Sequence, residues 1–138
     1  MRLIAAALIA VAAPTAAYRG QTSQHKVASV IASADGQVQR IRIGYSAPCR
    51  DPRYRFPNVM RFEPPFDTAT PDLVQTRLTL REKLKGGGRT KQTVKLTATR
   101  AGNAWSGTFA TTIVLTRAGK HLDTCRLKRV RWTARMTH

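Results

Sequence analysis

The sequence predicts an all-β fold, an antiparallel immunoglobulin-like β-sandwich with a small β-barrel as the alternative, after a cleaved signal peptide. Short stretches that alternate apolar and polar residues recur about every dozen residues, as the strands of a sandwich do. Turn signals such as SADGQ, RAGN and RAGK separate these stretches, and no long stretch keeps a capped helical period. The length of 138 residues suits one domain.

Residues 1–17 predict a secretory signal peptide, which leaves residues 18–138 as a single secreted β domain. Arg2 supplies a positive charge, residues 3–13 form an apolar segment too short to span a bilayer, and residues 15–17 are small enough for cleavage. We therefore expect a secreted or cell-envelope-associated protein with no stable membrane insertion after cleavage. The alternative is a buried N-terminal helix or strand.

The chain has two cysteines, Cys49 and Cys125, which are far apart in the sequence. An oxidising compartment outside the cytoplasm favours their pairing, so we expect a disulfide. No histidine or carboxylate accompanies either thiol at the spacing of metal ligands. We therefore expect no metal and no cofactor.

The first half of the domain predicts a hairpin followed by a proline-rich segment. Asp35-Gly36 is a strong hairpin-turn signal. The strand after it should end at Cys49, with alternate residues facing the core, namely Ile41, Ile43, Tyr45 and Ala47. Residues 50–72 are rich in proline and predict loop and edge structure with one short strand near 59–62.

Residues 73–99 predict a hairpin around the three glycines 86–88. The even-numbered residues are largely apolar on both sides, and a turn centred on Gly87 pairs Leu80 with Val94 on that face. This register also places Lys83 opposite Lys91 on the outer face.

The last two strands follow the turns RAGN and RAGK. Pairing Thr99 with Ala104 directs Trp105 and Phe109 inward, and Trp132 is inward on the final strand, so we expect both tryptophans in the core. Cys125 and Leu127 have the opposite parity to Val130, Trp132, Ala134 and Met136. A β-bulge near Lys128 is therefore expected.

Three motifs carry a resemblance to a known family: YRGQTSQ from Tyr18, WSGTF at 105–109, and the closing Cys125 with VRWTARM. With them, nearly the whole domain resembles a family of small, uncharacterised exported β-sandwich proteins of high-GC bacteria. That resemblance implies a secreted β-sandwich and no particular reaction, ligand or site residue. The chain departs from the family pattern at Lys128, where a glycine is usual.

Positive charge is the extreme feature of the composition, with 24 Lys and Arg against 7 Asp and Glu. Such a surface attracts polyanions, although a solvated exterior biased toward arginine is an equally simple explanation. The outward strand positions that could bind a polyanion are Arg77, Arg81, Lys83, Lys91, Lys95, Arg129, Arg131 and Arg135. A second cluster of cations and aromatic rings, which could instead close one end of the sandwich, consists of Arg53, Tyr54, Arg55 and Phe56.

Catalytic signals are few. Ser106, His121 and Asp123 could be combined into a triad on paper, but no nucleophile-elbow context accompanies them. Glu82 should point toward the apolar face. A glutamate in this position is more often a strand-end carboxylate paired with arginine than a catalytic acid. We expect a non-catalytic protein that binds an anionic polymer of the cell envelope or the exterior. An extracellular nucleic-acid-binding module is the alternative, a hydrolase comes third, and the oligomeric state stays open.

Overall fold

The computed structural model describes residues 15–137, and these residues form strands joined by turns and loops. The strands are β1 (Thr15–Thr22), β2 (Val27–Ser33), β3 (Val38–Pro48), β4 (Arg55–Phe62), β5 (Thr68–Thr70), β6 (Leu73–Lys83), β7 (Gly88–Ala101), β8 (Ala104–Arg117) and β9 (Lys120–Met136). The all-β prediction is confirmed.

The predicted signal peptide lies mostly in residues 1–14, which are outside the described residues. Residues 15–17 form the first positions of β1 and pair with β2. Within the described part of the chain, no helix has the length and hydropathy of a membrane span.

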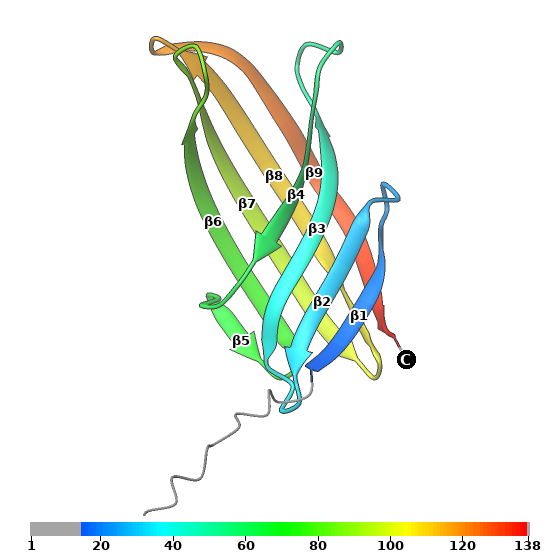
Figure 1. The fold of residues 1–138 in the computed structure, drawn as a ribbon. Coiled ribbons are helices and arrows are strands. Elements are labelled where there is room, and N and C mark those ends of the chain that lie inside the picture. The colour runs from blue at the N-terminus through cyan, green and yellow to red at the C-terminus, as the bar shows by residue number, and fades with distance from the viewer. Residues whose placement is uncertain (1–14, 138) are drawn as a thin grey trace, which may run out of the picture.

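All nine strands belong to one antiparallel sheet with the order β4-β3-β2-β1-β9-β8-β7-β6-β5 (Figure 1). The sequence predicted the two sheets of an immunoglobulin-like sandwich, and the structure shows one sheet instead. The reason is that β1 pairs with β2 on one side and with β9 on the other, which joins two meanders into a continuous sheet. The sheet is not closed, because β4 and β5 form its two edges.

The core lies between the two halves of this curled sheet. In Figure 1, β4 crosses in front of β7 and β8. The ring centroids of Tyr45 on β3 and Phe109 on β8 are 4.9 Å apart, and those of Phe62 on β4 and Phe109 are 6.2 Å apart. The Gln92 side-chain amide on β7 donates a hydrogen bond of 2.7 Å to the Tyr45 hydroxyl. Burial raises the pKa of Tyr45, while hydrogen bonds from Gln92 and Asn58 act in the opposite direction.

Both tryptophans are in the core, as predicted, and each pairs with a small residue on the neighbouring strand. Trp105 is fully buried and Trp132 is 2% exposed. Trp132 on β9 pairs with Gly107 on β8, and Trp105 on β8 pairs with Ala134 on β9. An added Cβ at Gly107 would overlap the backbone carbonyl oxygen of Thr97 on β7. Gly107, which pairs with the buried Trp132, therefore has no room for a side chain against the backbone of β7.

Most predicted faces of the strands are confirmed, whereas two predicted registers are wrong by two residues. The long β6–β7 hairpin turns about Gly86, so Leu80 pairs with Gln92. The β7–β8 turn begins at Ala101, which pairs with Ala104. The bulge near Lys128 is confirmed, because the β8–β9 register shifts between Phe109 and Thr111.

Other local predictions have mixed outcomes. The Asp35-Gly36 turn joins β2 to β3, with the amide of Ser33 donating to the carbonyl of Gln37. β4 is longer than the short strand predicted near 59–62, and it contains Pro57, which an edge strand tolerates. Leu80 was predicted to face the core but is 41% exposed.

The predicted disulfide between Cys49 and Cys125 is confirmed. It joins the segment after β3 to β9, so it connects the two meanders far from the β1–β9 pairing along β9. The amide of Arg50 reinforces this connection, because it donates to the backbone carbonyl of Thr124 and to the carboxylate of Asp123, at 2.9 and 3.0 Å.

Candidate polyanion-binding face

The outer face of β6 and β7 carries rows of directly opposed cations. Arg77 pairs with Lys95, Arg81 with Lys91, and Lys83 with Arg89. Like charges that face each other across a strand pair are destabilising, and all six side chains are exposed. The sequence predicted five of these cations as a site, and the structure brings them together on adjacent strands. The predicted opposition of Lys83 and Lys91 is wrong in detail, because the register differs by two residues.

β8 separates this cationic surface from a second one on β9. The outward side chains of the middle of β8 carry no charge and are half-buried; they are Thr108, Ala110, Thr112, Val114 and Thr116. β9 then presents Arg126 and Lys128, both exposed. The outer face therefore has an uncharged strip along β8 with cations on either side.

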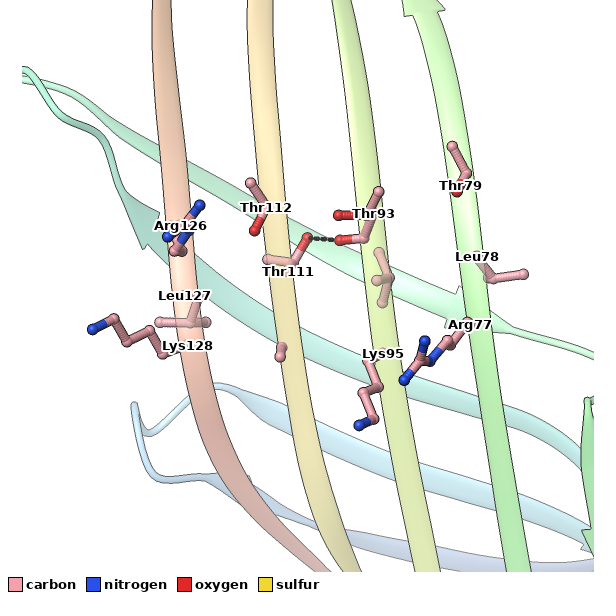
Figure 2. Close-up of a pocket in the computed structure, with 12 residues that line it drawn as sticks. Arg77, Leu78, Thr79, Thr93, Lys95, Thr111, Thr112, Arg126, Leu127 and Lys128 are labelled. Carbon is pink, nitrogen blue, oxygen red and sulfur yellow. Dashed lines mark hydrogen bonds between the residues drawn. The ribbon is translucent and has the colours of Figure 1, made fainter.

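A shallow depression of about 410 Å³ lies across this strip. Figure 2 shows Arg77 and Lys95 side by side at one margin, with Arg126 and Lys128 at the other. The small side chain of Thr112 lies between the two margins. An anion placed here would be within reach of cations from three strands, and hydroxyl groups of the floor could donate hydrogen bonds to it.

Arg126 and Lys128 were missing from the predicted site. Their signal was the parity change on β9: if Cys125 and Leu127 face inward, then the residues on either side of Leu127 face outward. The prediction used only the parity of the final residues of the strand. Arg129, which was predicted, lies at the bulge and is exposed.

The remaining predicted cations of β9 lie further along the same strand, outside the depression. Arg131 is held through its backbone, which exchanges hydrogen bonds with Ser23. Arg135 pairs with Arg19 on β1, so opposed cations also occur where β9 meets β1. The positive surface therefore continues from β9 onto β1.

Within residues 15–137, the ion pairs are Arg40–Glu63, Arg53–Asp51, Arg61–Glu63 and Arg100–Asp72. None of them involves a cation of the depression. The carboxylate of Asp67 lies at the edge of β6, where it accepts a hydrogen bond of 2.8 Å from the backbone amide of Arg77. The described part of the chain thus leaves the charges of this face without a carboxylate partner.

The second predicted cluster does not join this face, and its cations already have partners. Arg53 forms an ion pair of 2.7 Å with Asp51 and lies over the ring of Tyr54. This pairing lowers the pKa of Asp51 and raises that of Arg53. Arg55 donates to the side chain and the carbonyl of Ser46.

The two aromatic residues of that cluster behave differently from each other. Phe56 is half-buried and packs against the core, whereas Tyr54 is 58% exposed. The alternative prediction was that both rings close one end of the fold. Only Phe56, which packs against the core, agrees with it.

The residues that could have formed a catalytic triad are not together. Ser106 pairs with Thr133, near one end of β9, whereas His121 lies near the other end, where Thr116 pairs with it. About ten residues of β8 separate the two pairs, or roughly 30 Å. Glu82 has the same parity on β6 as Leu80 and is exposed, so it is not part of the buried core.

Comparisons of this chain with models of known protein families, with curated proteins and with solved structures give no match. The resemblance to a family of exported β-sandwich proteins therefore stays a prediction.

Proposed function

We propose that this chain is exported after cleavage of residues 1–17 and is not an enzyme. Its curled sheet would enclose the core as the layers of a sandwich do, and its outer face over β6–β9 would bind an anionic polymer of the cell envelope or the exterior. The observation that carries the proposal is the arrangement of Arg77, Lys95, Arg126 and Lys128 around an uncharged depression without carboxylate partners among the described residues.

The opposed cations favour a bound anion over empty solvent. Each cross-strand pair, such as Arg77 and Lys95, carries a repulsion that a shared anionic group would relieve. Exposed ion pairs are individually weak, about 1 kcal/mol at most. A polymer that meets several of them at once gains from its repeated charges, because the later contacts form within one complex.

The chemistry of the face favours a polymer without aromatic bases. The outward residues of β6–β9 include threonine, serine, arginine and lysine, and no phenylalanine, tyrosine or tryptophan of these four strands faces outward. Proteins that bind single-stranded nucleic acid without sequence preference stack its bases on aromatic side chains. We therefore propose a flexible chain of phosphates or carboxylates, such as an acidic polysaccharide or a polyphosphate.

The proposal predicts that four substitutions at the depression reduce polymer binding. In the variant Arg77→Gln, Lys95→Gln, Arg126→Gln, Lys128→Gln, the affinity for polygalacturonate or polyphosphate should fall about tenfold to a hundredfold at low salt, since four exposed ion pairs are lost. A matched control removes four exposed cations elsewhere: Lys26→Gln, Arg42→Gln, Arg50→Gln, Lys120→Gln. Titration calorimetry at several salt concentrations measures both variants.

The outcomes separate the alternatives. A loss confined to the depression variant supports the proposal, and its salt dependence should weaken because fewer counterions are released. An equal loss in the control variant means that the attraction is diffuse and contradicts a dedicated face. Tighter binding of single-stranded DNA of equal charge would favour the nucleic-acid-binding alternative.

Export predicts a particular mature protein. After expression of the full chain in a bacterial host, intact-mass spectrometry of the exported fraction should find Tyr18 at the N-terminus and no free thiol. The core residue Tyr18 would then be the first residue of β1, still paired with Val30 on β2 and Met136 on β9. A protein that begins at Met1 and retains reduced cysteines would contradict this part of the proposal.

A further inference from the structure

One end of the molecule brings together three segments, 49–55, 80–91 and 114–125. They are the upper loops of Figure 1 with the adjoining strand ends. The disulfide Cys49–Cys125 joins the first segment to the third. The Arg117 guanidinium donates hydrogen bonds of 3.1 and 2.6 Å to the carbonyl of Gly86, which joins the third segment to the second. We call these three segments the upper end.

Exposed apolar side chains gather at the upper end. Leu80 and Leu84 are each 41% exposed and Leu122 is 60% exposed, and Tyr54 lies at the same end. The other large apolar side chains exposed in residues 15–137 are Val27 and Val59, on the β2–β4 side of the sheet. Leu122 on β9 is three strand spacings from β6, or about 14 Å. The apolar groups are thus spread over one end of the sheet.

The exposure of Leu80 has a structural cause. Val74, Thr76, Leu78 and Leu80 alternate along β6 on the side that faces the core. Val74 and Thr76 are buried, Leu78 is half-buried, and Leu80 is exposed. The opposite half of the sheet therefore covers the start of β6 and leaves its end uncovered. This uncovered part of the inner face needs another apolar environment if it is to be removed from water.

The excess of positive charge is larger at the upper end than at the opposite end. The three segments of the upper end hold ten Lys and Arg against three carboxylates, Asp51, Glu82 and Asp123. The loops of the opposite end, at 33–38, 63–72 and 99–104, hold four carboxylates and Arg100, and the adjoining strand ends add Arg19, Arg40 and Arg135. A negatively charged surface would attract the upper end much more strongly than the opposite end, where the charges balance, and this would orient the molecule as it approaches.

We propose that the upper end docks on the surface of an anionic lipid bilayer. Leu80, Leu84 and Leu122 would enter the interface between headgroups and acyl chains, with the amphipathic ring of Tyr54 at headgroup level. The surrounding cations would contact lipid phosphates, each contributing a factor of about five in affinity near an anionic surface. A soluble polymer would use the charges and leave the leucines in water, whereas a second copy of this chain would oppose like charges. An anionic membrane offers phosphates to the cations and an apolar layer to the leucines.

The decisive experiment changes the leucines and leaves every charge in place. It measures co-sedimentation of the purified protein with vesicles of phosphatidylglycerol and phosphatidylcholine, and with vesicles of phosphatidylcholine alone. The test variant is Leu80→Ser, Leu84→Ser, Leu122→Ser. The control variant is Val27→Ser, Val59→Ser, which removes exposed apolar side chains from the other half of the sheet. Thermal unfolding of each variant checks that the fold is intact.

The wild-type protein should bind the anionic vesicles, and part of this binding should survive at high salt, because salt screens charges and does not weaken apolar burial. The partition coefficient of the test variant should be about tenfold to a hundredfold lower than that of the wild type, as expected for the loss of three half-exposed leucines. The control variant should partition as the wild type does. Because the polymer-binding substitutions lie elsewhere, the two proposals can fail separately.

Three results would overturn the proposal. One is wild-type binding that disappears completely at high salt. Another is equal partition of the wild type and the leucine variant. The third is a dimer, detected by analytical ultracentrifugation, that the leucine substitutions abolish without affecting vesicle binding; a second copy would then be what covers these leucines.

Discussion

Replacement of Cys49 and Cys125 by serine should lower the free energy of unfolding by about 4 kcal/mol. The disulfide closes a long loop, with a separation of 76 positions between its cysteines, and so restricts the unfolded chain strongly. The two meanders are also joined by the pairing of β1 with β9, near the far end of β9. At the end of β3, the connection to β9 depends on the disulfide and on the backbone hydrogen bonds beside it, such as that from Arg50 to Thr124.

Urea unfolding measures this effect directly. The Cys49→Ser, Cys125→Ser variant and the wild type with a reductant should have similar free energies of unfolding. The oxidised wild type should be more stable than both. The reductant should leave the stability of the variant unchanged, which controls for effects of the reductant itself. A difference between oxidised and reduced wild type below about 1 kcal/mol would contradict the loop-entropy argument.

The variant Gly107→Ala should lose about 3 kcal/mol of stability or more. Gly107 lies between Ala98 on β7 and Trp132 on β9, where an added Cβ would overlap the carbonyl oxygen and carbon of Thr97. These atoms belong to the backbone, so no side-chain rotation relieves the overlap. The strands would have to move apart, and the buried ring of Trp132 would lose its packing.

A glycine with room for a side chain is the matched control. At Gly88 an added Cβ would meet Leu84 and the Thr116 carbonyl at 3.6 and 3.7 Å, which is ordinary van der Waals contact. Gly88→Ala should therefore change the free energy of unfolding by less than about 0.5 kcal/mol, as a tolerated surface substitution does. Similar stability losses for the two variants would show that the close approach at Gly107 is not what makes glycine necessary there.

Several features could be predicted from local pattern because they depend on side-chain alternation. The inward strand before Cys49, the core positions of Trp105 and Trp132, and the bulge near Lys128 all follow from a period of two. The registers of two hairpins were wrong by two residues for the same reason. A shift of two leaves each residue on its predicted face, so alternation cannot detect it, and the turn geometry at Gly86 and Gly102 decides.

The candidate site was predicted in part. Its outward cations on β6 and β7 follow from alternation, but their grouping with Arg126 and Lys128 across β8 depends on the order of the strands. The uncovered leucines at the upper end could not be predicted, because Leu80 continues the same apolar alternation as the buried Val74. Only the extent of the opposite half of the sheet distinguishes them.

By itself, the sequence determined the strands, the face of most side chains, the disulfide and the excess of positive charge, because these depend on composition and on neighbours along the chain. The tertiary structure decided that there is one sheet, through the pairing of β1 with β9 from opposite ends of the domain. It also decided which cations share a surface and which leucines are left in water. Those properties depend on contacts between residues far apart in the sequence, where local periodicity carries no information.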